Sequence, residues 1–111
     1  MSFKELIKKY SKEDVRFTKH AKEKLFEFSF TENFIAEKLF DVAKLVYEEY
    51  HEEKKTCKLI YEHSKDYLLA IVVALNEKIR IVTVYKTSKK IQKLINQRGI
   101  VHIWKVFKTE K

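Results

Sequence analysis

Two pairs of side chains in this sequence are suited to acid–base chemistry. His20 and Lys24 are four residues apart in a segment with helical periodicity, so they lie one above the other on one face of a helix. Histidine exchanges a proton near neutral pH, and the lysine could supply a positive charge beside it. Thr83 and Tyr85 alternate along a predicted strand and could donate hydrogen bonds from one of its faces. In the plainer interpretation, the first pair caps or coats a helix and the second pair only packs in a sheet.

A predicted β-hairpin carries the second pair. Residues 67–86 consist of a nearly apolar run, a polar break at Asn76-Glu77-Lys78, and a second run rich in Ile, Val, Thr and Tyr. The first run is apolar on both faces, which predicts a central strand covered on both sides. The second run alternates, and its predicted faces are Ile79, Ile81, Thr83 and Tyr85 on one side and Arg80, Val82, Val84 and Lys86 on the other.

Three helices are predicted before the hairpin. Residues 2–10 and 19–28 have apolar residues at helical spacing, and Thr18 is a suitable N-cap for the second of these helices. Thr31 is a suitable N-cap for a third helix, whose predicted core face is Phe34, Ile35, Leu39, Val42 and Ala43. Residues 44–50 could prolong this helix or form a strand, and a strand from about Leu45 is favoured.

The remaining elements complete a predicted α+β domain. A strand is expected over residues 56–63, before the hairpin. Thr87 or Ser88 is expected to cap a late helix that ends at Gly99, and residues 100–107 are expected to form a last strand. We therefore expect a single domain over residues 1–111, with N-terminal helices packed on an antiparallel sheet of about four to five strands and with a late helix.

Positive charge is concentrated at one end of the sequence. The chain has 111 residues and a formal net charge of +8, and residues 86–111 hold eight basic residues against one acidic residue. A one-sided positive field favours an acidic partner such as RNA, DNA, an anionic membrane or an acidic protein. A lysine-rich solubilising surface is the alternative. The candidate nucleic-acid-binding residues are Arg80, Lys86, Lys89, Lys90, Lys93 and Arg98.

The composition also bears on the cellular compartment, on membrane spans and on metal or cofactor sites. A single cysteine, Cys57, excludes an internal disulfide and favours a reducing cytoplasm. No apolar run approaches the ~20 residues of a membrane span, and the charged N-terminal segment does not have the pattern of a signal peptide. With one glycine and no His/Cys cluster at ligand spacing, neither a phosphate loop nor a metal site is predicted, and no cofactor is expected. High Lys and Glu content resembles proteins from hot environments.

Residues 17–86 resemble a known family. The matching residues are Phe17-Thr18-Lys19-His20-Ala21, then Lys24, a helix start at Thr31, and the strand Ile81-Val82-Thr83-Val84-Tyr85-Lys86. They resemble a small domain of unknown function with a His-Ala-x-x-Arg helix and a terminal Val-Thr-Val-Tyr strand. That domain is similar to BrnT-type toxins and, more distantly, to RelE-like ribonucleases of toxin–antitoxin pairs. Residues 87–111 form a basic extension outside the resemblance.

The resemblance implies helices followed by an antiparallel sheet, a metal-independent ribonuclease activity and an antitoxin as a protein partner. This sequence departs from the family pattern at Lys24, where the family has arginine, and around Phe28-Ser29, where a second arginine is usual. Arginine binds a phosphate through two parallel hydrogen bonds, whereas lysine acts as a point charge. These departures weaken the prediction of catalysis.

Cleavage of RNA without a metal requires a base for the 2′-hydroxyl, a cation beside the phosphorane and an acid for the 5′-oxygen. His20 is the expected base or acid, Lys24 and Arg80 are expected phosphate contacts, and Thr83 and Tyr85 are expected hydrogen-bond donors. His51 and His63 are expected to be solvated. Two alternatives remain: a non-catalytic nucleic-acid-binding protein that uses the basic C-terminal segment, and a module that binds a partner such as an antitoxin.

Overall fold

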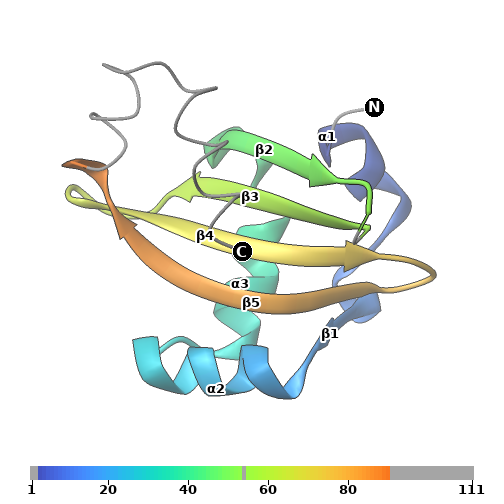
Figure 1. The fold of residues 1–111 in the computed structure, drawn as a ribbon, viewed down its shortest axis with the longest axis horizontal. Coiled ribbons are helices and arrows are strands. Elements are labelled where there is room, and N and C mark those ends of the chain that lie inside the picture. The colour runs from blue at the N-terminus through green and yellow to red at the C-terminus, as the bar shows by residue number, and fades with distance from the viewer. Residues whose placement is uncertain (1–2, 54, 91–111) are drawn as a thin grey trace.

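The computed structural model describes residues 3–53 and 55–90, which form a five-stranded mixed sheet with helices packed against it (Figure 1). The α+β class expected from the sequence is confirmed. The helices are α1 (Phe3–Leu6), α2 (Lys19–Phe28) and α3 (Glu32–Leu39), and single 3-10 turns cover Ile7–Lys9, Lys12–Asp14 and Val42–Lys44. The strands are β1 (Val15–Phe17), β2 (Leu45–His51), β3 (Thr56–Glu62), β4 (Tyr67–Leu75) and β5 (Ile79–Ser88).

The strand order is β1-β5-β4-β3-β2, and the prediction of a purely antiparallel sheet is wrong at one edge. Strands β2 to β5 pair antiparallel, but β1 pairs parallel to β5, with Val15 opposite Ile79 and Phe17 opposite Ile81. The sequence predicts only an extended connector at Val15–Phe17. Three residues carry too little pattern to predict a partner, and the pairing satisfies backbone groups at the edge of β5.

The predicted hairpin is confirmed, and β4 is the middle strand of the sheet. Every residue from Leu68 to Val73 is buried, as expected for a strand covered on both faces. Leu69, Ile71 and Val73 belong to the large core under the helices, whereas Leu68 and Ala70 join Ile60 in a smaller cluster on the other face. We refer to these as the helix-side face and the second face of the sheet.

A β-bulge in β5 overturns the predicted faces of that strand. Val72 lies opposite Thr83 but Val73 lies opposite Ile81, so Val82 is an extra residue in β5. Alternation therefore slips by one residue, which exchanges the faces of the residues beyond it. The helix-side core contains Ile79, Ile81 and Val84, and Tyr85 packs against the cluster on the second face.

Thr18 joins the start of α2 to this bulge. Its Oγ1 accepts a hydrogen bond from the Ala21 amide at 3.1 Å, as expected of an N-cap. The same hydroxyl donates to the Val82 carbonyl oxygen at 3.1 Å, and the Thr18 amide donates to the Ile81 carbonyl oxygen at 3.1 Å. Figure 1 shows the result, with α2 lying along β5 beyond the end of β1. The predicted limits of α2 are confirmed.

The third helix also starts as predicted, since Thr31 Oγ1 accepts from the Phe34 amide at 3.0 Å. Its predicted core face is only partly right: Ile35 and Leu39 are buried, but Phe34 is 36% exposed and Ala43 is exposed. The helix ends at Leu39, so the residues after it no longer follow helical spacing. Phe34, in the first turn, instead lies against other rings near one end of the sheet.

The expected late helix and last strand, together with Lys93 and Arg98, lie outside the described residues. At their boundary, Ser88 Oγ accepts from the Lys90 amide at 3.0 Å, as an N-cap residue does. None of the helices in residues 3–53 and 55–90 is both long and apolar enough to cross a membrane.

Candidate nucleic-acid interface

The structure separates the two pairs of predicted catalytic residues. His20 is exposed on the first turn of α2, and Lys24 Nζ lies 3.3 Å from a carboxylate oxygen of Glu27. Helix α2 packs on the helix-side core, whereas Thr83 and Tyr85 belong to the second face. Within residues 3–53 and 55–90, no hydrogen bond, ion pair or ring contact joins one pair to the other.

The bulge also redistributes the predicted phosphate contacts. Arg80 lies opposite Ala74 and shares the second face with Thr83 and Tyr85, contrary to the prediction from alternation. Lys86 lies opposite Leu69 and belongs to the helix-side face. Burial, followed by the charge of Glu49, raises the pKa of Tyr85, so its hydroxyl keeps its proton and would act as a hydrogen-bonding group or weak acid and not as a base.

The second face holds a polar group that the sequence did not predict. Glu49 is 8% exposed, its Oε2 lies 2.6 Å from His51 Nε2, and its Oε1 accepts from the Tyr47 hydroxyl at 3.2 Å. Lys58, opposite Glu49 in the sheet, is 4% exposed. The prediction of a solvated His51 is therefore wrong. Such burial keeps these groups away from a macromolecular ligand and favours a structural role.

Cys57 is also structural. It is buried in β3, and burial followed by the charge of Glu48 raises its pKa to about 12. Its thiol therefore stays protonated and is a poor nucleophile, as its place in an apolar strand predicts.

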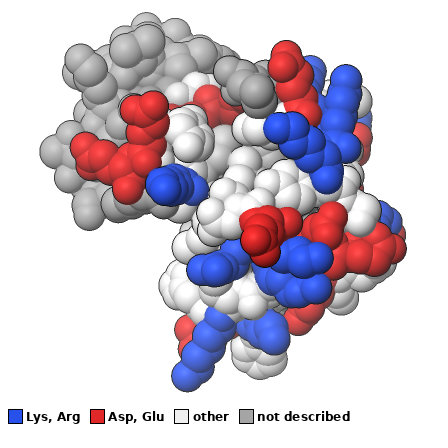
Figure 2. All heavy atoms as spheres, turned by 90° about the vertical axis from the view of Figure 1, so that its right-hand side faces the viewer, with Lys and Arg blue, Asp and Glu red and all other residues white. Residues whose placement is uncertain are grey.

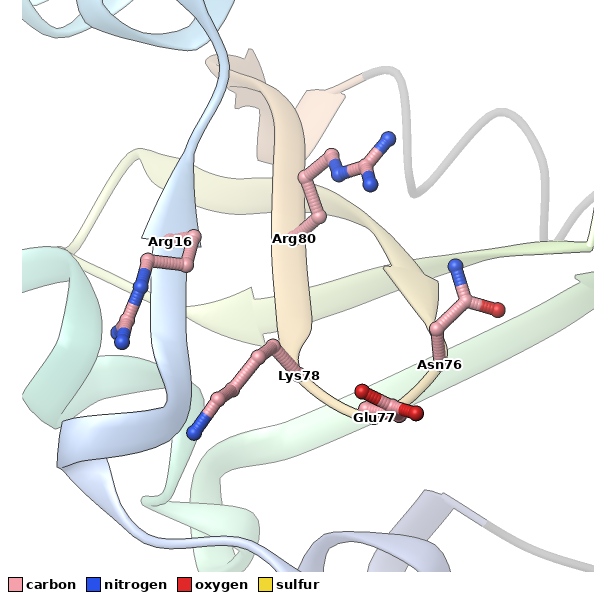
Figure 3. Close-up of a pocket in the computed structure, with 5 residues that line it drawn as sticks. All are labelled: Arg16, Asn76, Glu77, Lys78 and Arg80. Carbon is pink, nitrogen blue, oxygen red and sulfur yellow. The ribbon is translucent and has the colours of Figure 1, made fainter.

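The β4–β5 turn lies at one end of the sheet, beside a cavity of about 540 Å³ lined by Arg16, Asn76, Glu77, Lys78 and Arg80 (Figure 3). The side chains of Arg16 and Arg80 point away from each other in this view, so they do not converge on one ligand. Figure 2 faces the same end of the molecule and shows Lys and Arg interspersed with Asp and Glu. In that view, neither positive nor negative charge dominates this end of the molecule.

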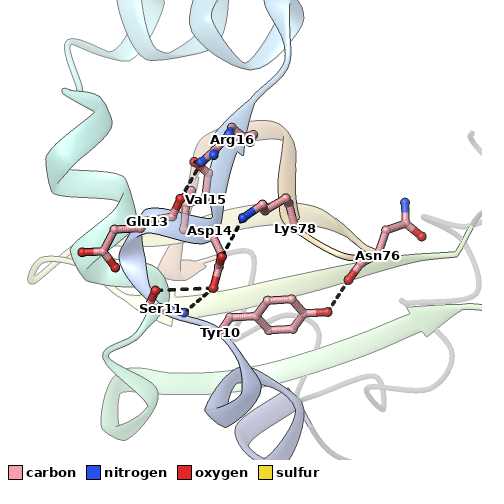
Figure 4. A network of polar contacts seen from close by, with 8 residues as sticks. All are labelled: Tyr10, Ser11, Glu13, Asp14, Val15, Arg16, Asn76 and Lys78. Atoms are coloured by element: carbon pink, nitrogen blue, oxygen red, sulfur yellow. Dashed lines mark hydrogen bonds and ion pairs between the residues drawn. The ribbon is translucent and has the colours of Figure 1, made fainter.

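Several polar groups at this end bind other parts of the protein (Figure 4). The Tyr10 hydroxyl donates to the Asn76 carbonyl oxygen at 2.6 Å, and Lys78 Nζ lies 3.0 Å from Asp14 Oδ1. Arg16 donates to the Glu13 carbonyl oxygen at 2.6 Å. A hydrogen bond from the Ser11 amide, followed by Lys78, lowers the pKa of Asp14. These contacts tie the hairpin turn to the N-terminal segment.

At the opposite end of the sheet, lysines line most of a second cavity. A cavity of about 270 Å³, which we name the lysine pocket, lies beside the β3–β4 turn. Its walls are Lys38, Lys44, Glu62, His63, Ser64, Lys65 and Lys89. Four lysines and one glutamate thus line this cavity. Cations gathered from separate elements, with little opposing charge, are typical of a site that binds phosphate groups.

Hydrogen bonds hold the walls of the lysine pocket in place. The buried Tyr61 hydroxyl donates to the Leu39 carbonyl oxygen at 2.8 Å, which fixes the end of α3, and so Lys38, against the end of β3. The Ser64 amide donates to the Tyr67 carbonyl oxygen at 3.0 Å. The Lys89 amide donates to the Asp66 carbonyl oxygen at 2.9 Å. Three segments far apart in sequence therefore keep fixed positions around the pocket.

Aromatic rings adjoin the lysine pocket. The ring of Phe34 stacks on that of Phe30 at 5.4 Å between centroids, and the His63 ring meets both of them edge-on, at 6.0 and 5.6 Å. On the same sheet end, Lys86 Nζ lies 5.5 Å from the centroid of the Tyr67 ring. Phe34 is 36% exposed and Tyr67 is 45% exposed. Exposed rings beside cations can stack nucleic-acid bases.

The sequence predicts a solvated His63. In the structure its ring instead packs on two phenylalanines. Burial, followed by the positive charges of Lys38 and Lys86, lowers its pKa from the ordinary value of 6.5. The imidazole is therefore neutral at neutral pH and has one nitrogen that can accept a proton.

Some residues in and near the lysine pocket were predicted from the sequence, and others are known only from the structure. Lys89 was predicted to bind nucleic acid and lines the pocket, and Lys86 lies close enough to lower the pKa of His63. The sequence did not single out Lys38, Lys44 or Lys65. No local signal marks these three residues, because each is one lysine among many until the fold brings their elements together.

The described residues contain no group of three or more His, Cys, Asp or Glu side chains that could hold a metal ion. Comparisons with known proteins find no match to this chain: no family model, no curated protein and no solved structure corresponds to it.

Proposed function

We propose that this protein binds single-stranded RNA at the lysine pocket and the aromatic rings beside it. The observation that carries the proposal is the convergence of four lysines on one cavity with a single carboxylate. Phosphate neutralisation by lysines supplies most of the affinity for a nucleic acid. The exposed ring of Phe34 offers a surface on which an unpaired base can stack.

Two further arguments favour a single strand of RNA as the ligand. The cavity of about 270 Å³ is of a size to hold one nucleotide unit of a strand. Stacking on a side chain also requires an unpaired base. The choice of RNA over DNA rests on the resemblance of residues 17–86 to ribonuclease families.

A fluorescence anisotropy titration tests the proposal. The ligand is a labelled oligouridylate of about eight nucleotides, titrated at several salt concentrations. We expect the affinity of the wild type to fall steeply with salt, with a logarithmic slope of about −0.7 for each phosphate contacted. The double variant Lys38→Gln/Lys65→Gln should bind roughly three- to tenfold more weakly and show a shallower slope.

The control is Lys4→Gln on α1, which lies outside the lysine pocket and makes the same change of charge as one of the two pocket substitutions. It should bind like the wild type. Equal losses in the control and in a pocket variant with one substitution would show that only net charge matters, and would contradict the proposal.

A second candidate function is metal-independent cleavage of RNA, as in the toxin of a toxin–antitoxin pair. The observation that favours it is a neutral His63 beside Lys38 and Lys86. The imidazole could take the proton of a 2′-hydroxyl while its oxygen attacks phosphorus and the bond to the 5′-oxygen breaks. A lysine would stabilise the phosphorane and a second donor would protonate the 5′-oxygen, leaving a 2′,3′-cyclic phosphate and a 5′-hydroxyl.

An RNA cleavage assay in EDTA separates the possible catalytic residues. Activity abolished by His63→Gln but kept by His20→Ala/Tyr85→Phe would assign the chemistry to the lysine pocket. The reverse result would support the residues predicted from the sequence. If the wild type binds RNA but does not cleave it, the result would support RNA binding as the function and would contradict the cleavage function.

A further inference from the structure

We propose that the lysine pocket recognises the phosphorylated end of an RNA strand, with the terminal phosphate among the lysines and the terminal base on Phe34. This inference rests on the proposed RNA-binding function and narrows its ligand to a strand that carries a phosphate monoester. The charge, the size and the surroundings of the pocket support it independently.

The charge of the pocket matches a monoester better than a phosphodiester. Four lysines against Glu62 leave three positive charges in excess. A phosphodiester within a strand carries one negative charge, whereas a phosphate monoester carries about 1.5 to 2 at pH 7 and offers three terminal oxygens. Lys38, Lys44, Lys65 and Lys89 come from four different segments, so they can approach such a group from several directions.

The size of the pocket favours a strand end. Its volume of about 270 Å³ lies just below the range of about 300–1,000 Å³ that is usual for small-molecule sites. A phosphate with its sugar fits this volume, and for this reason we place the end of a strand there. The turn that holds Ser64 and Lys65 bounds one side, and the amide hydrogen bonds of Ser64 and Lys89 hold this wall in place.

The aromatic rings beside the lysine pocket indicate where the terminal base of the RNA would lie. His63 lines the pocket and its ring also meets Phe34 edge-on, with the centroids 6.0 Å apart. A nucleotide whose phosphate lies beside His63 therefore has Phe34 within reach of its base. Phe34 is backed by Phe30 at 5.4 Å, which keeps its ring in position for stacking.

The test compares oligouridylates of one sequence with a 5′-phosphate, with a 3′-phosphate or with two hydroxyl ends, as competitors of a labelled RNA in the anisotropy assay. We expect one of the phosphorylated forms to bind at least about fivefold more tightly than the hydroxyl form. The form that binds best identifies the end. An oligouridylate with two hydroxyl ends and one more nucleotide controls for the added charge. Its affinity should exceed that of the shorter hydroxyl form by much less than the phosphorylated form does.

Variants locate the effect. Lys65→Gln should remove most of the preference for the phosphorylated end, whereas Lys4→Gln should keep it. Phe34→Ala should weaken the phosphorylated and hydroxyl forms alike, because it removes stacking and not the phosphate contact. Equal binding of phosphorylated and hydroxyl strands by the wild type would overturn the inference and leave RNA binding intact. Absence of binding to any RNA would overturn both proposals.

Discussion

At the scale of single residues, His63 shows how surroundings change the role of a side chain. Its sequence position, after a strand and before a polar turn, predicts a solvated ring. The fold packs its ring edge-on against two stacked phenylalanines. Burial, followed by the charges of Lys38 and Lys86, lowers its pKa. Tyr85 changes in a comparable way, because a one-residue slip in β5 moves it to the face opposite the helices.

The lowered pKa of His63 predicts how stability depends on pH. The unfolded chain takes up a proton near pH 6.5, whereas the folded protein takes it up only at lower pH. His63 therefore destabilises the fold as the pH falls through about 6.5, and its effect is constant at higher pH. The difference in Tm between the wild type and His63→Gln should change in favour of the wild type from about pH 5 to pH 7 and then stay constant at higher pH. A difference that is independent of pH would contradict the prediction.

At the scale of elements, the start of α2 is held more firmly than the start of α3. Both helices have a threonine N-cap, and each cap accepts one amide hydrogen bond. Only Thr18 also donates to the strand beside it, at the carbonyl oxygen of Val82. The bulge in β5 thus has a partner outside the sheet, which explains how the extra residue is accommodated.

Two matched substitutions test this difference. Thr31→Val removes only a cap and should lower the free energy of unfolding by about 1 kcal/mol. Thr18→Val removes a cap and leaves the Val82 carbonyl oxygen without its donor, so it should cost about 2–3 kcal/mol. Urea unfolding monitored by circular dichroism measures both values, and Thr18→Ser should restore most of the loss. Equal costs for the two valine variants would show that the contact with β5 adds nothing.

At the scale of the whole molecule, the two ends of the sheet differ in kind. At the β4–β5 turn, hydrogen bonds and an ion pair tie the hairpin to the N-terminal segment, and charges of both signs mix (Figures 2 and 4). At the β3–β4 turn, lysines from several elements gather with one carboxylate. The first end holds the fold together and the second is the surface that we propose for RNA.

The hydroxyl of Tyr61 links the helix layer to the sheet at the second end, so its removal should affect both stability and binding. Tyr61→Phe leaves the buried carbonyl oxygen of Leu39 without a donor and should cost about 1–3 kcal/mol in urea unfolding. It should also weaken RNA binding, since Lys38 precedes Leu39 and loses its fixed position. Tyr85→Phe is the control, because no hydrogen bond of its hydroxyl exists among the described residues, and it should cost under about 0.5 kcal/mol. Similar losses in both variants would argue against the link.

By itself, the sequence determined the local elements of this protein. The limits of α2, the N-caps Thr18 and Thr31, the polar break at Asn76-Glu77-Lys78 and the buried middle strand all follow from side chains that act within a few residues of one another. Lys86 and Lys89 could be chosen as candidates for the same reason, since the excess of charge is visible along the chain.

Only the tertiary structure decided which faces and which ends meet. The alternation of β5 could not show the bulge, because Val82 is a β-branched residue that suits either face of a sheet. The pairing of β1 with β5 joins segments more than 60 residues apart, and three residues are too few to predict it. The lysine pocket depends on Lys38, His63 and Lys89 being brought together from separate elements. Such contacts arise from the packing of the whole chain, which no local pattern encodes.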